Sequence, residues 1–284
     1  MLGLFLIKQA IIFLISILIE ISMPSTNSSF VNYILKGSIA YITLNRADKR
    51  NALNYQFVVE LKQAFERAET DEDIKIIVLK ANGEAFCAGA DLEYLCSLQT
   101  NTYEENLIDS THLSELYYKI YTLKKIVIAQ IEGHAIAGGC GLAAVCDFSF
   151  AIPTALFGYT EVKIGFIPAI VSIFLARKIN EGRTRELLLT GNLITANAAE
   201  RIGLINYISN ATEIEAAVNK FATTLSEQTS GQAIALTKTL IAETAGLSLK
   251  DALQLAAIQN AKARNTNDCK AGIKAFLSKE KIVW

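Results

Sequence analysis

The alternation of apolar and polar positions divides the chain into a mixed strand-and-helix region and a helical end. The runs "FVNYILK" and "SIAYITLN" alternate on either side of Gly37 and predict a β-hairpin. The run "IKIIVLKA", with four consecutive apolar residues at its centre, predicts a strand that is buried on both faces. Asn54 is placed to cap a helix that reaches about Thr70. Further along, a helix is predicted over about 103–123, and strands are predicted from Ile126 to the glycines at 138–139 and over 147–152.

From Pro168 onward the pattern is almost entirely helical, with "LINYI" as the one further strand signal. Helices are predicted over 169–178, 183–190, 196–201, 213–227, 232–244 and 248–263. The chain shows no internal repeat and no low-complexity linker. We therefore expect one folded unit with a core over 23–205 and a helical C-terminal subdomain over 206–284.

The first 22 residues are far more apolar than anything that follows. Lys8 and Glu20 interrupt the run, and its uninterrupted part is shorter than the ~20 residues that a membrane span needs. No basic stretch or small-residue cleavage site marks a secretory signal. The pattern favours Met23 as the initiator and residues 1–22 as a start-site artefact, with a membrane or signal segment and a packed helix as alternatives. A chain that starts at Met23 is expected to be soluble and cytoplasmic, without membrane contact.

Charge and cysteine content exclude several classes of protein. Lys and Arg number 27 against 28 Asp and Glu, and no basic run is present, so a dedicated nucleic-acid surface is not expected. The five cysteines show no paired metal-binding spacing. They are expected to be reduced and mostly buried, in a reducing compartment.

Two glycine turns carry the first chemical signal. "FCAGADL" and "HAIAGGCGL" each place small residues between a strand and a helix start, where free backbone N–H groups favour an anion. Two such N–H groups converging on one oxygen would stabilise an enolate. Either turn alone could equally be a simple connection.

Five segments in order make the pattern specific: "NRADKRNALN", "AFCAGADL", "EGHAIAGGCGLAAVCDF", "FGYTEVKIGFIPA" and "LLLTGNLITANAAERIGLIN". Together they resemble the crotonase superfamily, also called the enoyl-CoA hydratase/isomerase family, over about residues 31–263. The resemblance implies an α/β fold of the ClpP/crotonase type, a ββα spiral with a C-terminal helical trimerisation subdomain. It also implies a homotrimer or a dimer of trimers, and an acyl-CoA thioester substrate. No cofactor or metal is implied, since coenzyme A enters as part of the substrate.

The resemblance also assigns expected roles to individual residues. The N–H groups of Ala90 and Gly138 would form an oxyanion hole. The loop around Lys49 and Ala52 would border the adenine and phosphates of coenzyme A, although Ala47 departs from the family's usual "NRP". Further substrate contacts are expected from Ala88, Asp91, Leu92 and Gly141. For Asp91, a helix-capping role alone is the simpler reading.

Hydratases of the family usually carry two carboxylates, and here the first position is Gly141. Glu161 occupies the second and is the expected acid/base. One glutamate can protonate Cα as water adds to Cβ, or carry a proton from C2 to C4. The segment from Thr160 to Ile179 resembles a bacterial branch that hydrates 3-methylglutaconyl-CoA and related branched enoyl-CoA esters, and Gly141 is expected to leave room for a bulkier acyl group.

A 2-enoyl-CoA hydratase is therefore the primary prediction. The first alternative is a Δ3,Δ2-enoyl-CoA isomerase that uses the same Glu161, and the second is a weakly active acyl-CoA-binding or RNA-binding protein. Other polar residues are weaker candidates: neither His112 nor His134 has a partner at a triad spacing, Cys140 is expected to be a packed thiol, and Asp147 is expected to fix a turn.

Overall fold

The computed structural model describes residues 29–284, so the predictions about residues 1–22 and about Met23 lie outside it. Within this range, no helix combines the length and the apolar character needed to cross a bilayer.

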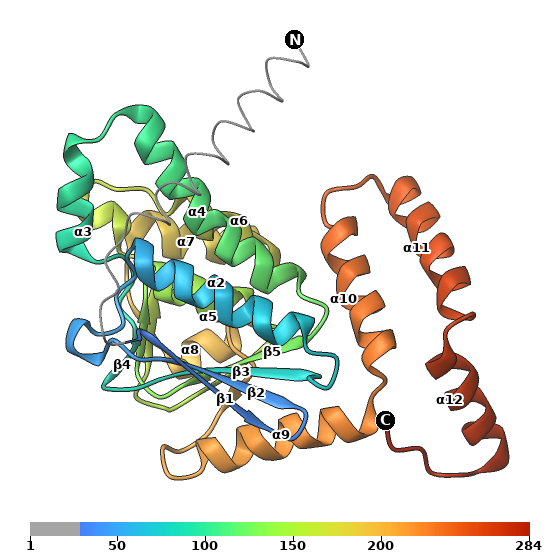
Figure 1. The fold of residues 1–284 in the computed structure, drawn as a ribbon. Helices are drawn as coiled ribbons and strands as arrows, with labels where there is room; N and C mark the ends of the chain where they lie inside the picture. The colour runs from blue at the N-terminus through green and yellow to red at the C-terminus, as the bar shows by residue number, and fades with distance from the viewer. Residues whose placement is uncertain (1–28) are drawn as a thin grey trace.

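The larger sheet has six strands in the order β1-β2-β3-β5-β7-β10. Figure 1 labels β1, β2, β3 and β5 of this sheet. The predicted hairpin is confirmed, because β1 (Val31–Lys36) and β2 (Ile39–Leu44) pair antiparallel. The other strands are parallel to β2 and to one another: β3 (Ile76–Ala81), β5 (Ile126–Ile131), β7 (Phe148–Ala151) and β10 (Tyr207–Ile208).

The smaller sheet has four strands, β4 (Ala85–Cys87), β6 (His134–Ile136), β8 (Leu156–Gly158) and β9 (Ile194–Thr195). It corrects one prediction. The single strand expected from Ile126 to the glycines is two strands in different sheets, and β4 is the strand expected before the first glycine turn. The chain turns between the sheets at Gly133, where a Cβ would lie 2.2 Å from the carbonyl oxygen of Glu84, so only glycine fits.

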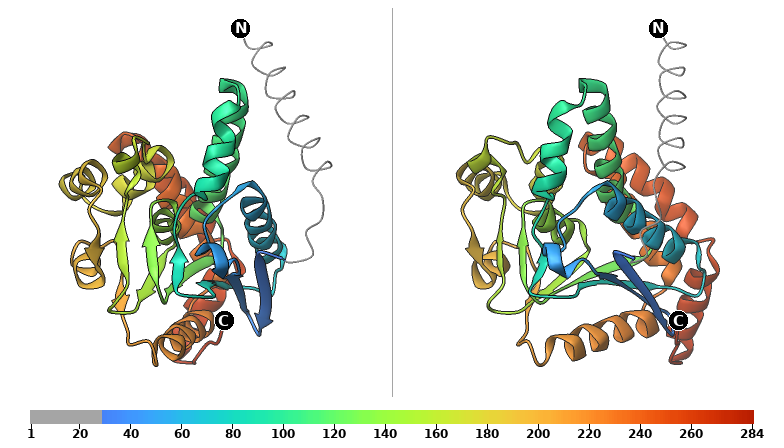
Figure 2. Two further views of the ribbon diagram at one scale, coloured as in Figure 1. Left: turned by 90° about the vertical axis from the view of Figure 1, so that its left-hand side faces the viewer. Right: turned by 60° about the vertical axis from the view of Figure 1, so that its left-hand side comes forward.

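Side chains alternate between two apolar layers along the larger sheet. In β3, Ile77 and Leu79 belong to the main core, whereas Ile76 and Val78 pack toward α9 (Ile214–Gln228). Figure 2 shows α9 running under this sheet. Because both faces are covered, the four residues from Ile76 to Leu79 are all apolar and buried, as the sequence predicts.

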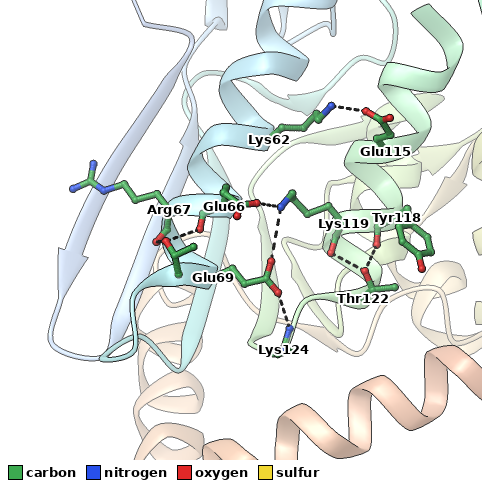
Figure 3. Close-up of polar contacts among 10 residues, drawn as sticks. Lys62, Glu66, Arg67, Glu69, Glu115, Tyr118, Lys119, Thr122 and Lys124 are labelled. Carbon is green, nitrogen blue, oxygen red and sulfur yellow. Dashed lines mark hydrogen bonds and ion pairs between the residues drawn. The ribbon is translucent and has the colours of Figure 1, made fainter. Parts of the chain in front are cut away.

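The helices α2 (Tyr55–Thr70) and α4 (Tyr103–Thr122) pack together. Asn54 caps α2 as predicted, since its Oδ1 accepts a hydrogen bond from the N–H of Phe57 at 2.9 Å. Ion pairs join their outer faces (Figure 3): Lys62 contacts Glu115 at 2.6 Å, and the Lys119 ammonium lies between two carboxylates of α2. These pairs fix the position of α4, which forms one wall of the pocket described below.

The remaining helices agree closely with the pattern. They are α3 (Leu92–Ser97), α5 (Gly138–Val145), α6 (Ala169–Lys178), α7 (Glu181–Thr190), α8 (Ala196–Arg201), α10 (Gly231–Thr244), α11 (Leu249–Ala263) and α12 (Asn267–Ser278), with short 3-10 turns at 47–49, 98–100 and 161–164. Only α12 lies beyond the predicted elements. In Figure 1, α10, α11 and α12 form an arm beside the two-sheet body.

Candidate active site

One cavity of about 510 Å³ lies between α2, α3, α4 and the segment 160–171. Of the predicted site residues, Ala88, Ala90, Leu92, Gly138 and Glu161 line it. Lys49, Ala52, Asp91 and Gly141 are not among the residues that line it. None of the described lining residues is Lys or Arg, and most of them are apolar.

The first glycine turn holds Ala90 at the pocket. Leu53 donates its N–H to the carbonyl of Gly89 at 2.7 Å, and Asp91 donates its N–H to the carbonyl of Leu53 at 2.8 Å. The N–H of Ala90, which lies between these two bonds, takes part in neither of them. Gly89 has φ +90°, and a Cβ there would lie 2.7 Å from the Cβ of Ala137 in the second turn. The two turns are therefore in direct contact.

The second turn places Gly138 at the start of α5. Ala137 has φ 53° and ψ −124°, a strained conformation for any residue but glycine. The Tyr117 hydroxyl donates to the carbonyl of Gly138 at 2.7 Å and so fixes this peptide to α4. Within residues 29–284, the N–H groups of Ala90 and Gly138 donate no hydrogen bond to another protein group. Two free donors thus belong to adjoining turns at one cavity.

Glu161 begins the 3-10 turn Glu161–Ile164 and faces the same cavity. Its Oε2 is buried, and no partner for it occurs among the described residues. Burial raises the pKa of this carboxyl, only partly opposed by its own backbone N–H. A raised pKa keeps a carboxyl protonated to higher pH than usual, which favours an acid/base role.

The expectation that Gly141 leaves room for a bulkier acyl group is wrong. A Cβ at this position would lie 2.3 Å from Cγ1 of Val171 and 3.0 Å from Cε1 of Tyr117. Val171, which lies on α6 and lines the pocket, therefore fills the space where the family's first carboxylate would stand. This wall of the pocket is apolar.

The loop expected to contact coenzyme A is held by ion pairs to the start of α3. Lys49 contacts Glu93 at 2.9 Å, and Arg46 contacts Asp91 at 2.7 Å. The Arg46 guanidinium also donates a hydrogen bond to the carbonyl of Ala52 at 2.8 Å. Asp91 caps α3 by accepting the N–H of Glu93 at 2.9 Å, which confirms the capping prediction.

Asn51 organises this loop and was not identified from the sequence. The residue is fully buried at φ 53°, and its side chain donates to the carbonyls of Asn82 at 2.9 Å and Ala85 at 2.8 Å. It also accepts the N–H of Arg46 at 2.8 Å. The tolerance of asparagine for left-handed backbone was the signal available in "DKRNAL".

A polar wall opposite the turns was also missed. Tyr94 of α3 donates its hydroxyl proton to Oδ1 of Asp109 on α4. One turn later, His112 stacks on Tyr55 with ring centroids 4.2 Å apart. Burial, helped by the Lys62 ammonium at 3.3 Å from Nδ1, lowers the pKa of His112 to about 4, so its ring is neutral at pH 7. All four aromatic or acidic side chains of this wall line the cavity.

The weaker sequence candidates have structural roles. Burial raises the pKa of Cys140 to about 12, so this thiol is a packed side chain as expected. His134 is exposed and accepts the N–H of Leu156 at 3.2 Å. Asp147 accepts from the N–H of Val127 at 2.7 Å and from Lys238 at 2.6 Å, which fixes its turn. The five cysteines are free, and three of them are buried.

The chain is similar to known proteins over most of its length. Residues 35–284 match the family described as enoyl-CoA hydratase/isomerase. The chain is 39% identical over 247 residues to a Thermus thermophilus protein named "Putative enoyl-CoA hydratase", covering 86% of this chain and 96% of that protein. It is 31% identical over 262 residues to the crotonyl-CoA hydratase of Syntrophomonas wolfei, covering 89% and 97%. The crystal structure of an enoyl-CoA hydratase from Shewanella pealeana has a TM-score of 0.85 at 29% identity, covering 91% and 97%. The predicted crotonase fold is thereby confirmed.

Proposed function

Because the chain belongs to the enoyl-CoA hydratase/isomerase family, we propose that it hydrates a 2-enoyl-CoA thioester with an uncharged acyl group to the 3-hydroxyacyl-CoA. The observation that carries the proposal is the buried, unpaired Oε2 of Glu161 in the same cavity as the two free N–H groups. The N–H groups of Ala90 and Gly138 would hold the enolate oxygen. The carboxyl of Glu161 would protonate Cα while water adds to Cβ, and the proton released by that water would return to the carboxylate.

The acyl group is expected to be uncharged. A 3-methylglutaconyl group carries its own carboxylate, which would need a cation inside the cavity. The described lining residues include Glu161 and Asp109 but no Lys or Arg. Bringing the carboxylate of the substrate into these apolar surroundings, beside two acidic side chains, would be costly. Segment 160–179 resembles the methylglutaconyl-CoA hydratase branch, but no described lining residue supplies the cation that a methylglutaconyl carboxylate would need.

Δ3,Δ2-Enoyl-CoA isomerisation is the second candidate, favoured by one observation. Val171 takes the space above Gly141, so the pocket has no carboxylate at the family's first position. Moving a proton from C2 to C4 needs only one carboxyl. In hydration, a single carboxyl must both protonate Cα and accept a proton from the attacking water. Glu161 would serve either reaction.

The two candidates are separated by product mass. We would give the purified protein crotonyl-CoA, 3-methylglutaconyl-CoA and a 3-enoyl-CoA, and follow the conjugated enoyl absorbance and the mass. Gain of one water supports the proposal, and greater turnover of crotonyl-CoA than of methylglutaconyl-CoA supports an uncharged acyl group. Conversion of the 3-enoyl ester at unchanged mass, without hydration of either 2-enoyl ester, would establish the isomerase instead.

The role of Glu161 is tested by Glu161→Gln, which keeps the shape of the side chain and removes its proton exchange. We expect kcat to fall by about 10²–10⁴-fold with little change in acyl-CoA affinity. The matched control is Glu104→Gln, at an exposed position on α4. Near-normal turnover of Glu161→Gln would remove Glu161 from the mechanism.

The pH profile gives a second test of the same carboxyl. Burial raises its pKa, and hydration needs the protonated form, so kcat for hydration should fall as pH rises through that pKa. Dehydration needs the carboxylate to take the proton from Cα, so its kcat should rise over the same interval. Parallel profiles in the two directions would contradict this assignment.

The C-terminal arm supports a proposal of self-association into trimers. Large apolar side chains are exposed along α10, α11 and α12 and the residues around them: Ile241, Leu247, Leu249, Leu253, Ile258, Ile273, Phe276, Leu277 and Val283. A single copy that leaves these side chains in water is unfavourable. Light scattering of the purified chain would report the mass of the assembly, and a monomer would refute the proposal.

A further inference from the structure

We propose that the α4 wall of the cavity is a subsite for a hydroxyl group on the acyl chain, with Asp109 as the hydrogen-bond acceptor. The inference deepens the proposed function, on which it rests, because it concerns the acyl part of the same acyl-CoA ligand.

The donors and acceptors on this wall define what can bind there. The Tyr94 hydroxyl gives its only proton to Oδ1 of Asp109. Among the described residues, Oδ2 of Asp109 accepts no hydrogen bond. Burial raises the pKa of the Asp109 carboxyl, and the hydrogen bond from Tyr94 opposes that rise by stabilising the carboxylate. In its carboxylate form the pair offers lone pairs and no proton. A ligand group that binds to it must donate a hydrogen bond.

The surroundings favour a neutral donor. Apolar side chains share the cavity with the pair: Leu92, Leu95, Leu113, Ile164, Phe166, Ile167 and Ile170. Once an acyl chain displaces water from the cavity, a carboxylate oxygen without a donor would be unfavourable beside such side chains, and a ligand hydroxyl would satisfy it. An ammonium would lose far more hydration free energy than a hydroxyl on entering the same cavity.

The geometry of α4 places the subsite away from the reacting carbons. Tyr117, whose hydroxyl binds the carbonyl of Gly138, lies a little over two turns after Asp109 on the helix. This separation is about 12 Å along the helix axis. The subsite would therefore meet the distal end of a medium-length acyl chain whose thioester lies at Gly138.

The wall is held in place before any ligand arrives. The ion pairs of Lys62 with Glu115 and of Lys119 with Glu66 and Glu69 fasten α4 to α2 (Figure 3). A preformed acceptor loses little entropy on binding, so its hydrogen bond contributes to affinity. A site built to bind a hydroxyl discriminates against the analogue that lacks one.

The competing explanation is that the bond from Tyr94 to Asp109 only ties α3 to α4. Loss of such a tie would weaken all acyl ligands to a similar extent. Loss of a subsite would weaken only the hydroxylated ligand. A comparison of two ligands that differ by one hydroxyl separates these explanations.

We would measure by calorimetry the binding of octanoyl-CoA and of ω-hydroxyoctanoyl-CoA, both saturated and unreactive. The wild type should bind the hydroxylated ligand about tenfold to a hundredfold more tightly. Asp109→Leu should abolish this preference and leave octanoyl-CoA binding within about threefold. Asp109→Asn, nearly identical in shape, should retain part of the preference for the hydroxylated ligand. The matched control Glu104→Gln should retain the whole preference.

Equal affinities of the wild type for the two ligands would overturn the subsite. So would a preference that survives in Asp109→Leu, or an equal loss for both ligands in that variant. Because neither ligand reacts, these results do not depend on which reaction is catalysed. Failure to hydrate crotonyl-CoA would refute the proposed function and leave the binding comparison valid.

Discussion

The contact between Gly141 and Val171 leads to a quantitative prediction about stability. A methyl group added at Gly141 would stand 2.3 Å from Cγ1 of Val171 and 3.0 Å from its Cβ. Both residues are buried, Val171 at 5% exposure, so the clash could be relieved only if the Val171 side chain left its packed position and turned toward the cavity that it lines. Gly141→Ala gains roughly 1 kcal/mol of helix propensity, but the overpacking should outweigh this gain and leave a net loss of about 1–3 kcal/mol.

The opposite change at the neighbouring position should relieve that strain. Val171→Ala alone removes two methyl groups, which costs about 1.6 kcal/mol in burial plus a cavity term, or roughly 2–3 kcal/mol in total. In the double variant, the methyl group introduced at position 141 would enter the vacated space. The double variant should then lose only about 1–2 kcal/mol, so the coupling free energy should be about 1 kcal/mol or more.

The assay is urea unfolding of the four proteins, followed by circular dichroism at one fixed protein concentration, because association also affects the measured stability. A double variant whose loss equals the sum of the single losses within about 0.5 kcal/mol would refute the argument. It would mean that Val171 does not occupy the space above Gly141 and that this space is open, as the sequence alone led us to expect.

Three further predictions concern the loop, the second turn and the polar wall. Asn51→Ala should lose roughly 3 kcal/mol of unfolding free energy, because the buried carbonyl of Ala85 and the part-buried carbonyl of Asn82 lose their donor and alanine is disfavoured at φ 53°. Asn51→Gly should lose less, and equal losses in urea unfolding would contradict the backbone contribution. Ala137→Gly should raise the free energy of unfolding by about 1 kcal/mol, since glycine adopts the observed φ and ψ freely, and a lower Tm would argue against strain there. The unfolded chain protonates His112 near pH 6.5 but the folded chain only near pH 4, so stability present above pH 6.5 is lost as pH falls toward 4. Between pH 7 and pH 5, the free energy of unfolding of His112→Phe should therefore fall by about 1 kcal/mol less than that of the wild type. Identical losses in the two proteins would show that the pKa of this ring is not lowered in the folded chain.

Local patterns predicted most of the fold because local physics decides it. The hairpin around Gly37, the cap at Asn54 and the boundaries of α6 and α8 follow from alternation, capping and amphipathic spacing. The division of the apolar run after Ile126 into two strands did not follow. It depends on how closely Gly133 approaches Glu84, a contact between segments far apart in the chain.

The same distinction applies to the site. Glu161 and the two glycine turns were found because their motifs are continuous in sequence, and they line one cavity. The filling of the Gly141 space by Val171 and the pairing of Tyr94 with Asp109 depend on side chains that meet only in the folded chain. Neither has a sequence signature, because tertiary packing alone brings the partners together.

The contact between the two glycine turns has a consequence for how activity would return during refolding. A Cβ at Gly139 would lie 2.1 Å from the carbonyl oxygen of Cys87, so the turns meet backbone to backbone. They belong to β4 and β6, parallel strands of the smaller sheet, and parallel pairing between distant segments forms slowly compared with helices. During refolding, far-ultraviolet ellipticity should therefore recover before turnover does, because turnover would return only when the two glycine turns have come together.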